Sequence, residues 1–330
     1  MPSPHGLAVA IDSGYDDHSI EAGILASAGL EVIERPCNGN VEAVRLAVRD
    51  ADAVFVRESP IDRAAIDGME RCRAIVRYGV GVDNIDIAAA AERRIHVANV
   101  PDYGVEEVSD QAIALMFAVV RRIASRDRDV RAGRWNVARQ EPMYRLAGRT
   151  LGVIGYGRVG AAFLRKTSAL GFMRTLVYDP AASALPDHAE AADLDTIFTQ
   201  ADIVSLHLPL LPTTARLVSA ERLAAMKPGA IIVNTSRGGL IDEAALAAAL
   251  VEGRLGGAGL DVYAVEPPAD SPPADAPQRR ADRPYGLVLR RERRRTPDQG
   301  GAGNRPRLRR RSAQALGQSL DLNPSDLKRG

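Results

Sequence analysis

Short apolar runs alternate with amphipathic segments along the first hundred residues. The apolar, β-branched runs predict strands at 7–12, 30–36, 51–59, 73–80 and 95–101. Segments of helical composition lie between them, such as SIEAGILASAG and VEAVRLAVRD. Strands that alternate with helices of this length form parallel sheets with both faces covered. Residues 1–101 are therefore predicted to form one doubly wound α/β domain.

A long helix and a second alternating series are predicted after this domain. The helix spans 104–135, with acidic residues in its first turn and basic residues near its end, as the helix dipole favours. Apolar runs at 150–156, 174–180, 201–209, 230–236 and 256–263 then predict a second parallel sheet. Residues 102–270 are predicted to form a second doubly wound domain.

The charge changes sign near residue 267. The net charge is +1, but residues 267–330 hold 15 basic and seven acidic side chains, whereas residues 1–266 hold 28 basic and 35 acidic ones. Arg and Pro dominate the tail at 271–330, which lacks a hydrophobic period and is predicted to be disordered. A basic tail is also compatible with nucleic-acid binding, but its one aromatic residue, Tyr285, and lack of a recognisable fold argue against it.

The cysteines and the N-terminus indicate the compartment. Cys37 and Cys72 lie in separate segments without metal-ligand spacing, which predicts buried, reduced thiols and no metal site. The start MPSPHGLAVAID lacks the features of a signal peptide, and no apolar stretch reaches the ~18 residues of a spanning helix. We expect a cytoplasmic protein without a membrane segment.

A glycine-rich turn is the first motif with a chemical meaning. Gly155, Gly157 and Gly160 form GxGxxG directly after an apolar strand and at the head of a helix, where backbone N–H groups bind a pyrophosphate. Asp179 ends the next strand, where a carboxylate accepts hydrogen bonds from ribose hydroxyls and repels a 2′-phosphate. Together they favour NAD over NADP. The alternative is a structural glycine turn beside an unrelated aspartate.

Three charged residues follow later strands of the same predicted sheet. Arg237, Asp261 and Glu266 lie at or after strand ends, which face the ligand crevice in open α/β sheets. An arginine there binds a 2-oxo carboxylate through two parallel hydrogen bonds, and a carboxylate at Glu266 orients an imidazole and raises its pKa. The alternative is that Arg237 and Glu266 are exposed loop charges.

Seven motifs in register resemble the NAD-dependent D-2-hydroxyacid dehydrogenases. They are RYGVGVDNID, NVPDYGVEEVSDQAIALMFAVVRR, VRAGRW, LGVIGYGRVG, VSLHLPLLPTT, MKPGAIIVNTSRGGLID and GLDVYAVEPP, within residues 50–268. The run NVPDYGVEEVSD is most similar to the branch of C-terminal-binding-protein-like dehydrogenases, with phosphoglycerate dehydrogenases as neighbours. The resemblance implies a flavodoxin-like substrate domain and a Rossmann NAD-binding domain.

The resemblance also implies a role for individual residues. Val80 and Gly81 would offer N–H groups to the substrate carboxylate, Arg237 would bind that carboxylate and the reacting oxygen, and Glu266 would pair with a catalytic histidine. The residues implied along the cofactor are Arg158 and Val159 at the pyrophosphate, Asp179 at the adenosine ribose, His207, Pro209 and Thr214, Thr235 near the nicotinamide ribose, Arg237, and Asp261 at the carboxamide.

The catalytic histidine of the family is missing from this sequence. The resemblance places it in a Pro-His or Ala-His motif after Glu266, but the last histidine here is His207, which is expected to line the cofactor rather than to replace the acid/base. Codons for Ala281–Leu289 can be chosen that read Leu-Thr-Ala-His-Thr-Ala-Trp-Tyr one nucleotide later. We therefore hypothesise a frameshift near Ser271 to Pro273, with the lost histidine codon across Pro284 and Tyr285.

The expected function follows from these residues and the resemblance. We expect hydride transfer between NAD(H) and a small D-2-hydroxy acid or 2-oxo acid, impaired in this chain because it lacks the proton donor and acceptor. A catalytically inactive NAD(H)-binding regulator of the C-terminal-binding-protein type is the alternative. A homodimer through the helical region after Val105 is also expected.

Overall fold

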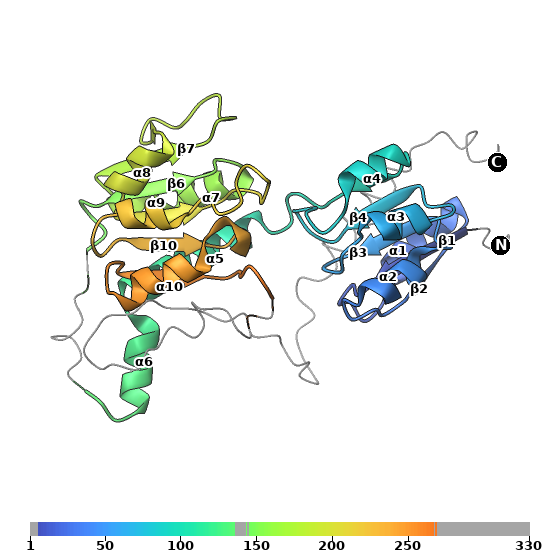
Figure 1. Ribbon diagram of the computed structural model, residues 1–330, viewed down its shortest axis with the longest axis horizontal. Helices are drawn as coiled ribbons and strands as arrows, with labels where there is room; N and C mark the ends of the chain where they lie inside the picture. The colour runs from blue at the N-terminus through green and yellow to red at the C-terminus, as the bar shows by residue number, and fades with distance from the viewer. Residues whose placement is uncertain (1–5, 136–142, 144, 267, 269–330) are drawn as a thin grey trace. The chain divides into compact units, whose positions relative to one another are not determined.

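The computed structural model describes residues 6–135, 143, 145–266 and 268, which divide into two compact units (Figure 1). Unit 1 ends at Gly104 and unit 2 begins at Val105, close to the predicted boundary after residue 101. The predicted tail at 271–330 lies outside the described residues. None of the described helices combines the length and apolar character that a membrane crossing needs.

Unit 1 contains a parallel sheet with helices on both faces. In its described residues the strand order is β2-β1-β3-β4-β5, which is the flavodoxin-like order. The strands are β1 (Gly6–Ile11), β2 (Leu30–Glu34), β3 (Ala53–Val56), β4 (Ala74–Arg77) and β5 (His96–Ala98). The helices are α1 (Ser19–Leu25), α2 (Val41–Val48), α3 (Arg63–Gly68) and α4 (Ile87–Glu92), with a 3₁₀ turn at Ala26–Ala28.

The alternation of side chains along the strands builds the two cores of unit 1. Val9 and Ile11 of β1 face α2, α3 and α4, whereas Ala8 and Ala10 face the opposite side, where Leu25 of α1 and the ring of Phe55 pack. All of these side chains are buried, so the strands are hydrophobic on both faces, as a covered parallel sheet requires.

Unit 2 contains the second parallel sheet. In the described residues its order is β11-β10-β9-β6-β7-β8, which is the Rossmann order when its strands are counted from β6. The strands are β6 (Thr150–Ile154), β7 (Arg174–Tyr178), β8 (Glu190–Ala191), β9 (Ile203–Leu206), β10 (Ile231–Asn234) and β11 (Gly257–Leu260). The helices are α5 (Val105–Val120), α6 (Ile123–Arg131), α7 (Arg158–Thr167), α8 (Leu194–Gln200), α9 (Ala220–Ala225) and α10 (Glu243–Val251), with 3₁₀ turns at Ser168–Leu170 and Gly238–Leu240. The predicted fold class is confirmed.

The helices of unit 2 cover both faces of its sheet. Leu115 and Met116 of α5 pack with Phe163 of α7 against one face, while Phe198 of α8 and Leu246 of α10 belong to the core on the other. Figure 1 shows α8, α9 and α10 along one side of the sheet. Several helices have an N-cap residue whose side chain accepts a hydrogen bond from the backbone N–H three residues later. Asp193 at α8 and Asp242 at α10 are examples.

The prediction of one long helix over 104–135 was wrong. The structure has α5 and α6, separated at Arg122, whose backbone is left-handed with φ at 56°. The reason lies in packing: α5 buries Leu115, Met116 and Val119, whereas α6 buries no residue. Because α6 contributes no buried side chain, tertiary contacts hold it in line with α5 only weakly.

Candidate active site

The register of the second sheet brings the predicted cofactor residues to one edge. Ile154 of β6 lies opposite Tyr178 of β7 and Leu206 of β9, while Asn234 of β10 lies opposite Leu206 and Leu260. The residues that follow these positions are Gly155, Asp179, His207, Thr235 and Asp261. Since β6 pairs with both β7 and β9, this edge includes the point where the strand order reverses, which is where such sheets bind ligands.

Backbone packing requires glycine in the turn between β6 and α7. Gly155 has φ at 97°, and a Cβ there would lie 2.5 Å from the carbonyl oxygen of His207. A Cβ on Gly160 would overlap the carbonyl oxygen of Gly155. Gly157 has open space around it and precedes α7 without a side-chain cap. The turn therefore holds α7 close to the sheet and leaves its first N–H groups for a ligand.

Asp179 is fixed beside this turn. Its Oδ2 accepts a hydrogen bond from the N–H of Tyr156 at 2.6 Å, and its Oδ1 accepts one from the N–H of Ala181 at 2.8 Å. The residue is half-buried, so the carboxylate is oriented but not enclosed. A carboxylate in this position has lone pairs left to accept hydrogen bonds from the two hydroxyls of a ribose.

His207 is enclosed at the end of β9. Its Nε2 lies 2.9 Å from Ser205 Oγ, and its ring centroid lies 4.9 Å from that of Phe163. Burial lowers the pKa of His207 to about 3, so the imidazole is neutral at physiological pH. A neutral, enclosed imidazole is a poor proton donor, which agrees with the expectation that His207 does not replace the missing acid/base.

Two buried polar atoms at this edge have no hydrogen-bond partner among the described residues. They are Nδ1 of His207 and Oγ1 of Thr235. Buried polar groups are normally paired, so partnerless ones beside a glycine-rich turn fit a polar ligand. Pro209 and Thr214 lie in the loop after β9, where Thr214 Oγ1 donates to the Pro209 carbonyl at 2.7 Å. Together with the Asp179 carboxylate, these groups fit a dinucleotide.

The loop after β10 is held by a residue that the sequence analysis did not identify. Asn234 is fully buried; its Nδ2 donates to the Arg237 carbonyl at 2.8 Å and its Oδ1 accepts from the N–H of Ser236 at 3.0 Å. A polar residue as the last member of the run AIIVN is the signal that could have revealed it. The Asn234 side chain thus fixes the backbone at Ser236 and Arg237, directly after Thr235.

The loops after β10 and β11 touch through their backbones. A Cβ on Gly238 would overlap the backbone of Tyr263, so the turn that carries Arg237 lies directly against the segment before Glu266. Glu266 is exposed, and its Oε1 accepts from the N–H of Tyr263 at 3.1 Å. The structure thus brings the loops of Arg237 and Glu266 together.

The Asp261 side chain is oriented by Gln111 of α5, a residue 150 positions earlier in the chain. Its Oδ1 accepts a hydrogen bond from Nε2 of Gln111 on α5 at 3.1 Å. The N–H of Asp261 also donates to the carbonyl of Asn234 at 3.0 Å. The carboxylate is therefore positioned by α5 and β10, a contact that the sequence analysis did not identify.

The remaining predicted residues lie elsewhere. Val80 and Gly81 follow β4 in unit 1, whose placement relative to unit 2 is not determined. Pro284 and Tyr285, where the lost histidine is expected, lie outside the described residues.

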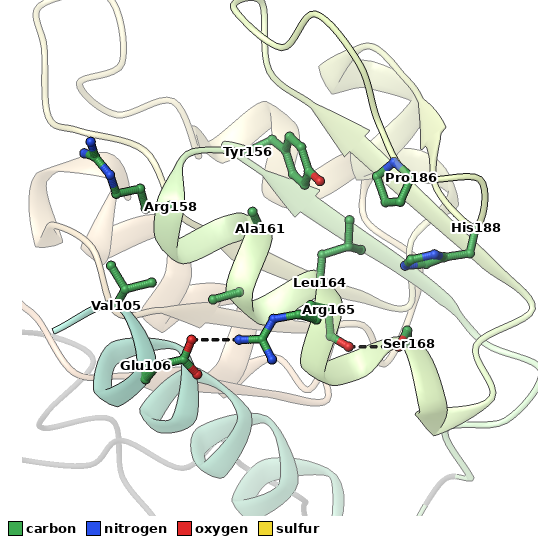
Figure 2. Close-up of a pocket in the computed structure, with 11 residues that line it drawn as sticks. Val105, Glu106, Tyr156, Arg158, Ala161, Leu164, Arg165, Ser168, Pro186 and His188 are labelled. Atoms are coloured by element: carbon green, nitrogen blue, oxygen red, sulfur yellow. Dashed lines mark hydrogen bonds and ion pairs between the residues drawn. The ribbon is translucent and has the colours of Figure 1, made fainter. Parts of the chain in front are cut away.

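A groove of about 580 Å³ runs along α7 in unit 2. Figure 2 shows Tyr156 and Arg158 at its upper end, and Arg165 reaching to Glu106 of α5 across its lower side. Of the described residues predicted to contact the cofactor, Arg158 is the one that lines this groove. The groove therefore adjoins the glycine-rich turn, although Asp179 is not among the residues that line it.

Comparison with known proteins agrees with this geometry. A family model described as D-isomer specific 2-hydroxyacid dehydrogenase, NAD binding domain, matches residues 113–280. A glycerate dehydrogenase from Methylorubrum extorquens is 40% identical over 228 residues, which cover 68% of this chain and 71% of the relative. The chain belongs to the D-isomer-specific 2-hydroxyacid dehydrogenase family.

Two further relatives support the assignment to this family. A glyoxylate reductase from Korarchaeum cryptofilum is 42% identical over 227 residues, which cover 67% of this chain and 68% of the relative. The crystal structure of the TT0316 protein from Thermus thermophilus has a TM-score of 0.78 and 33% identity, covering 95% of this chain and 96% of that one. The predicted family and its cofactor, NAD, are confirmed.

Proposed function

We propose that this chain binds NAD(H) and a small 2-hydroxy acid or 2-oxo acid, but carries out hydride transfer poorly because its proton donor is missing. The relatives named glycerate dehydrogenase and glyoxylate reductase support this substrate class. The observation that carries the proposal is the backbone contact between Gly238 and Tyr263, which joins the loops of Arg237 and Glu266 at one edge of the sheet.

NAD would be held by backbone and side chains of unit 2. The N–H groups of Arg158 and Val159 at the start of α7 would bind the pyrophosphate, and Asp179 would accept the hydroxyls of the adenosine ribose. His207, Pro209, Thr214, Thr235 and Asp261 would line the rest of the dinucleotide. When bound, the nicotinamide supplies hydride chemistry at C2 of the acid.

Arg237 and backbone N–H groups are the groups proposed to bind the substrate carboxylate. Arg237 would bind the carboxylate and polarise the C2 oxygen, because a guanidinium presents paired N–H donors to planar oxygens. Val80 and Gly81 of unit 1 would add backbone N–H groups. In this proposal unit 1 is the substrate-binding domain and unit 2 is the NAD-binding domain.

Proton transfer is the step that this chain lacks. A histidine paired with Glu266 would move the hydroxyl proton, but the sequence has no histidine after His207. Loss of a general acid/base lowers the rate by about 10² to 10⁴. We propose that a frameshift before Pro284 removed the histidine, so that the chain keeps its binding groups and loses most of its turnover.

The alternative is an NAD(H)-binding regulator of the C-terminal-binding-protein type. The observation that favours it is the same missing histidine, because a protein that senses NADH needs binding without turnover. The homodimer through the helical region after Val105 and the cytoplasmic location stay predictions.

Two measurements test the proposal. The gene is resequenced across the codons for Leu260 to Arg311, and a one-nucleotide change that restores an Ala-His-Thr-Ala-Trp segment supports the frameshift. NADH binding and NADH oxidation with glyoxylate or hydroxypyruvate are then measured for the chain as written and for the frame-corrected chain. We expect NADH binding by both, with turnover at least about 10²-fold higher in the corrected chain.

The contrary results separate the alternatives. An intact reading frame together with NADH binding and no turnover favours the regulator. Equal turnover by the two chains contradicts the missing-donor proposal, and absence of NADH binding contradicts the whole proposal.

A further inference from the structure

Helix α5 lies close to β11 because a glycine occupies the point of contact. A Cβ on Gly259 would lie 2.9 Å from the Cβ of Leu115, which is closer than two side chains pack. Leu115 is fully buried at this contact. A strand glycine often marks a place where another backbone approaches, and here it lets α5 rest directly on β11.

This contact sets the position of two polar residues. Gln111 precedes Leu115 by four positions, so the two side chains lie on the same face of α5. Asp261 follows Gly259 by two positions, and residues two apart in an extended chain share a face of the sheet. The N–H of Asp261 donates to the Asn234 carbonyl at 3.0 Å, which extends the pairing of β10 and β11 to this residue. The helix–strand contact therefore brings Gln111 and Asp261 together.

The hydrogen bond between these residues distinguishes the two carboxylate oxygens of Asp261. Nε2 of Gln111 donates to Oδ1 at 3.1 Å, and only the amide nitrogen of a glutamine can donate to a carboxylate. Within the described part of the chain, no hydrogen bond to Oδ2 is found. Because Asp261 is half-buried and its Oδ1 is held, Oδ2 keeps one direction in which it can accept a hydrogen bond from a ligand.

We propose that Gln111 is a positioning residue, which holds Asp261 so that Oδ2 accepts a hydrogen bond from the carboxamide of the nicotinamide. The proposal rests on the proposed function, which assigns Asp261 to this carboxamide. Gln111 acts through the carboxylate and does not itself touch the cofactor. Its hydrogen bond restricts the rotation of the Asp261 side chain before binding, so less freedom is lost when the cofactor binds.

The test compares NADH with ADP-ribose, which lacks the nicotinamide. Calorimetry gives the dissociation constant of each ligand for the full chain and for Gln111→Met, which keeps the length of the side chain but loses the donor. We expect the dissociation constant for NADH to rise about tenfold, because the carboxylate is then free to rotate away from the carboxamide. The constant for ADP-ribose should stay within about twofold of the wild type, since no hydrogen bond of this ligand depends on Asp261. Equal weakening of both ligands would overturn the proposal.

Gln200→Met is the matched control. Gln200 is an exposed glutamine of α8 in the same unit, and its Oε1 accepts a hydrogen bond from Arg174, the first residue of β7. This variant makes the same chemical change at the opposite end of the strands, so both ligands should bind to it as they bind to the wild type. Gln111→Asn keeps an amide but shortens the side chain by one methylene, and it should also weaken NADH more than ADP-ribose.

A double-mutant cycle tests whether Gln111 acts through Asp261. Asp261→Ala should weaken NADH at least as much as Gln111→Met does, with little effect on ADP-ribose. In the Asp261→Ala background, Gln111→Met should cause no further loss, because the carboxylate that Gln111 positions is gone. An equal loss of NADH binding in both backgrounds would mean that Gln111 acts on the packing of α5, and the proposal would be wrong.

The outcomes distinguish this proposal from the proposed function. If Asp261→Ala weakens NADH selectively and Gln111→Met does not, the positioning role is overturned and the proposed function stands. If Asp261→Ala leaves NADH binding unchanged, the assignment of Asp261 to the carboxamide fails and the positioning role fails with it. Absence of NADH binding by the wild type overturns both. Should Gln111→Met not fold, Gln111→Asn decides, and unchanged NADH binding by that variant overturns the proposal.

Discussion

His207 and Asp179 follow strands of one sheet, but their environments are opposite. The His207 ring is enclosed between Ser205 and Phe163 and is held neutral. The Asp179 carboxylate is half-buried and bonded to two backbone N–H groups, those of Tyr156 and Ala181. His207 therefore contributes the shape of a neutral ring, whereas Asp179 contributes a negative charge. The two roles are tested by different experiments.

The neutral state of His207 predicts a pH dependence of stability. Its pKa is about 3 in the folded chain and about 6.5 when unfolded, so below pH 6.5 the unfolded chain takes up a proton that the folded chain does not. The free energy of unfolding is therefore not reduced by His207 above pH 6.5, and it decreases as the pH drops from 6.5 toward 3. In urea denaturation, the free energy of unfolding of the wild type should fall by about 2 kcal/mol more than that of His207→Gln between pH 7 and pH 5. Parallel pH curves for the two proteins would contradict an enclosed, neutral His207.

Removal of the charge at Asp179 should change the preference between the two dinucleotides. Asp179→Asn keeps the size of the side chain but loses two charge-assisted hydrogen bonds to a ribose and the repulsion of a 2′-phosphate. Fluorescence titration should show NADH binding weakened about tenfold or more and NADPH binding weakened less. Asp187→Asn, in the loop between β7 and β8, serves as the matched control. An unchanged ratio of the two dissociation constants would exclude the assigned role of Asp179.

At the scale of elements, α5 and α7 are joined by a cluster of charges centred on Lys166. Its Nζ donates to the Glu106 carbonyl at 3.0 Å, to Ser109 Oγ at 2.8 Å and to Asp110 Oδ1 at 2.6 Å. Burial disfavours the ammonium ion, but the hydrogen bonds to Asp110 and Glu106 outweigh this effect and raise the pKa of Lys166. The cluster holds the helix that follows the glycine-rich turn against α5.

Lys166→Met should therefore destabilise unit 2 measurably. The variant keeps the length of the side chain but leaves the groups around Nζ without their donor, so we expect the free energy of unfolding to fall by about 1–3 kcal/mol. The control is Arg165→Met, which breaks an ion pair between exposed side chains of Arg165 and Glu106 and should cost less than about 1 kcal/mol. Equal losses in urea denaturation would mean that Lys166 acts as an ordinary surface charge.

The sequence predicted the strands of both sheets because each central strand is a continuous apolar run. It did not predict β8, since Glu190 and Ala191 are exposed and carry no apolar signal. The break at Arg122 was also missed, because α6 is helical by composition and its lack of packing is a tertiary property. GxGxxG and Asp179 were found by spacing, whereas Asn234 was not, because it acts on carbonyl and N–H groups whose positions depend on the folded loops.

At the scale of the whole molecule, the structure separates into two units with cores of their own. The candidate dinucleotide residues belong to unit 2, whereas Val80 and Gly81 belong to unit 1. Binding of NADH should therefore stabilise the two units unequally.

Hydrogen exchange measured by mass spectrometry tests this expectation. Saturating NADH should slow exchange in the segments 154–160 and 205–214, because a ligand bound to the native state suppresses local opening near its site. Exchange in β1 and β3 of unit 1 should not change. NADPH at the same concentration should protect the same segments less, and protection by NADH confined to unit 1 would contradict the assignment.

The contacts of Gly155, Gly160 and Gly238 have a consequence for how this protein diverges. Each of these glycines lies in direct contact with backbone atoms of a turn. Because no side chain lies between the two backbone segments, neither segment can change its path without moving the other. The turns after β6 and β9 must therefore be inherited together, and so must the turns after β10 and β11. A chimera with a single turn from a distant homologue would carry a mismatched surface, whereas exchange of the whole segment 150–266 would transfer a matched one.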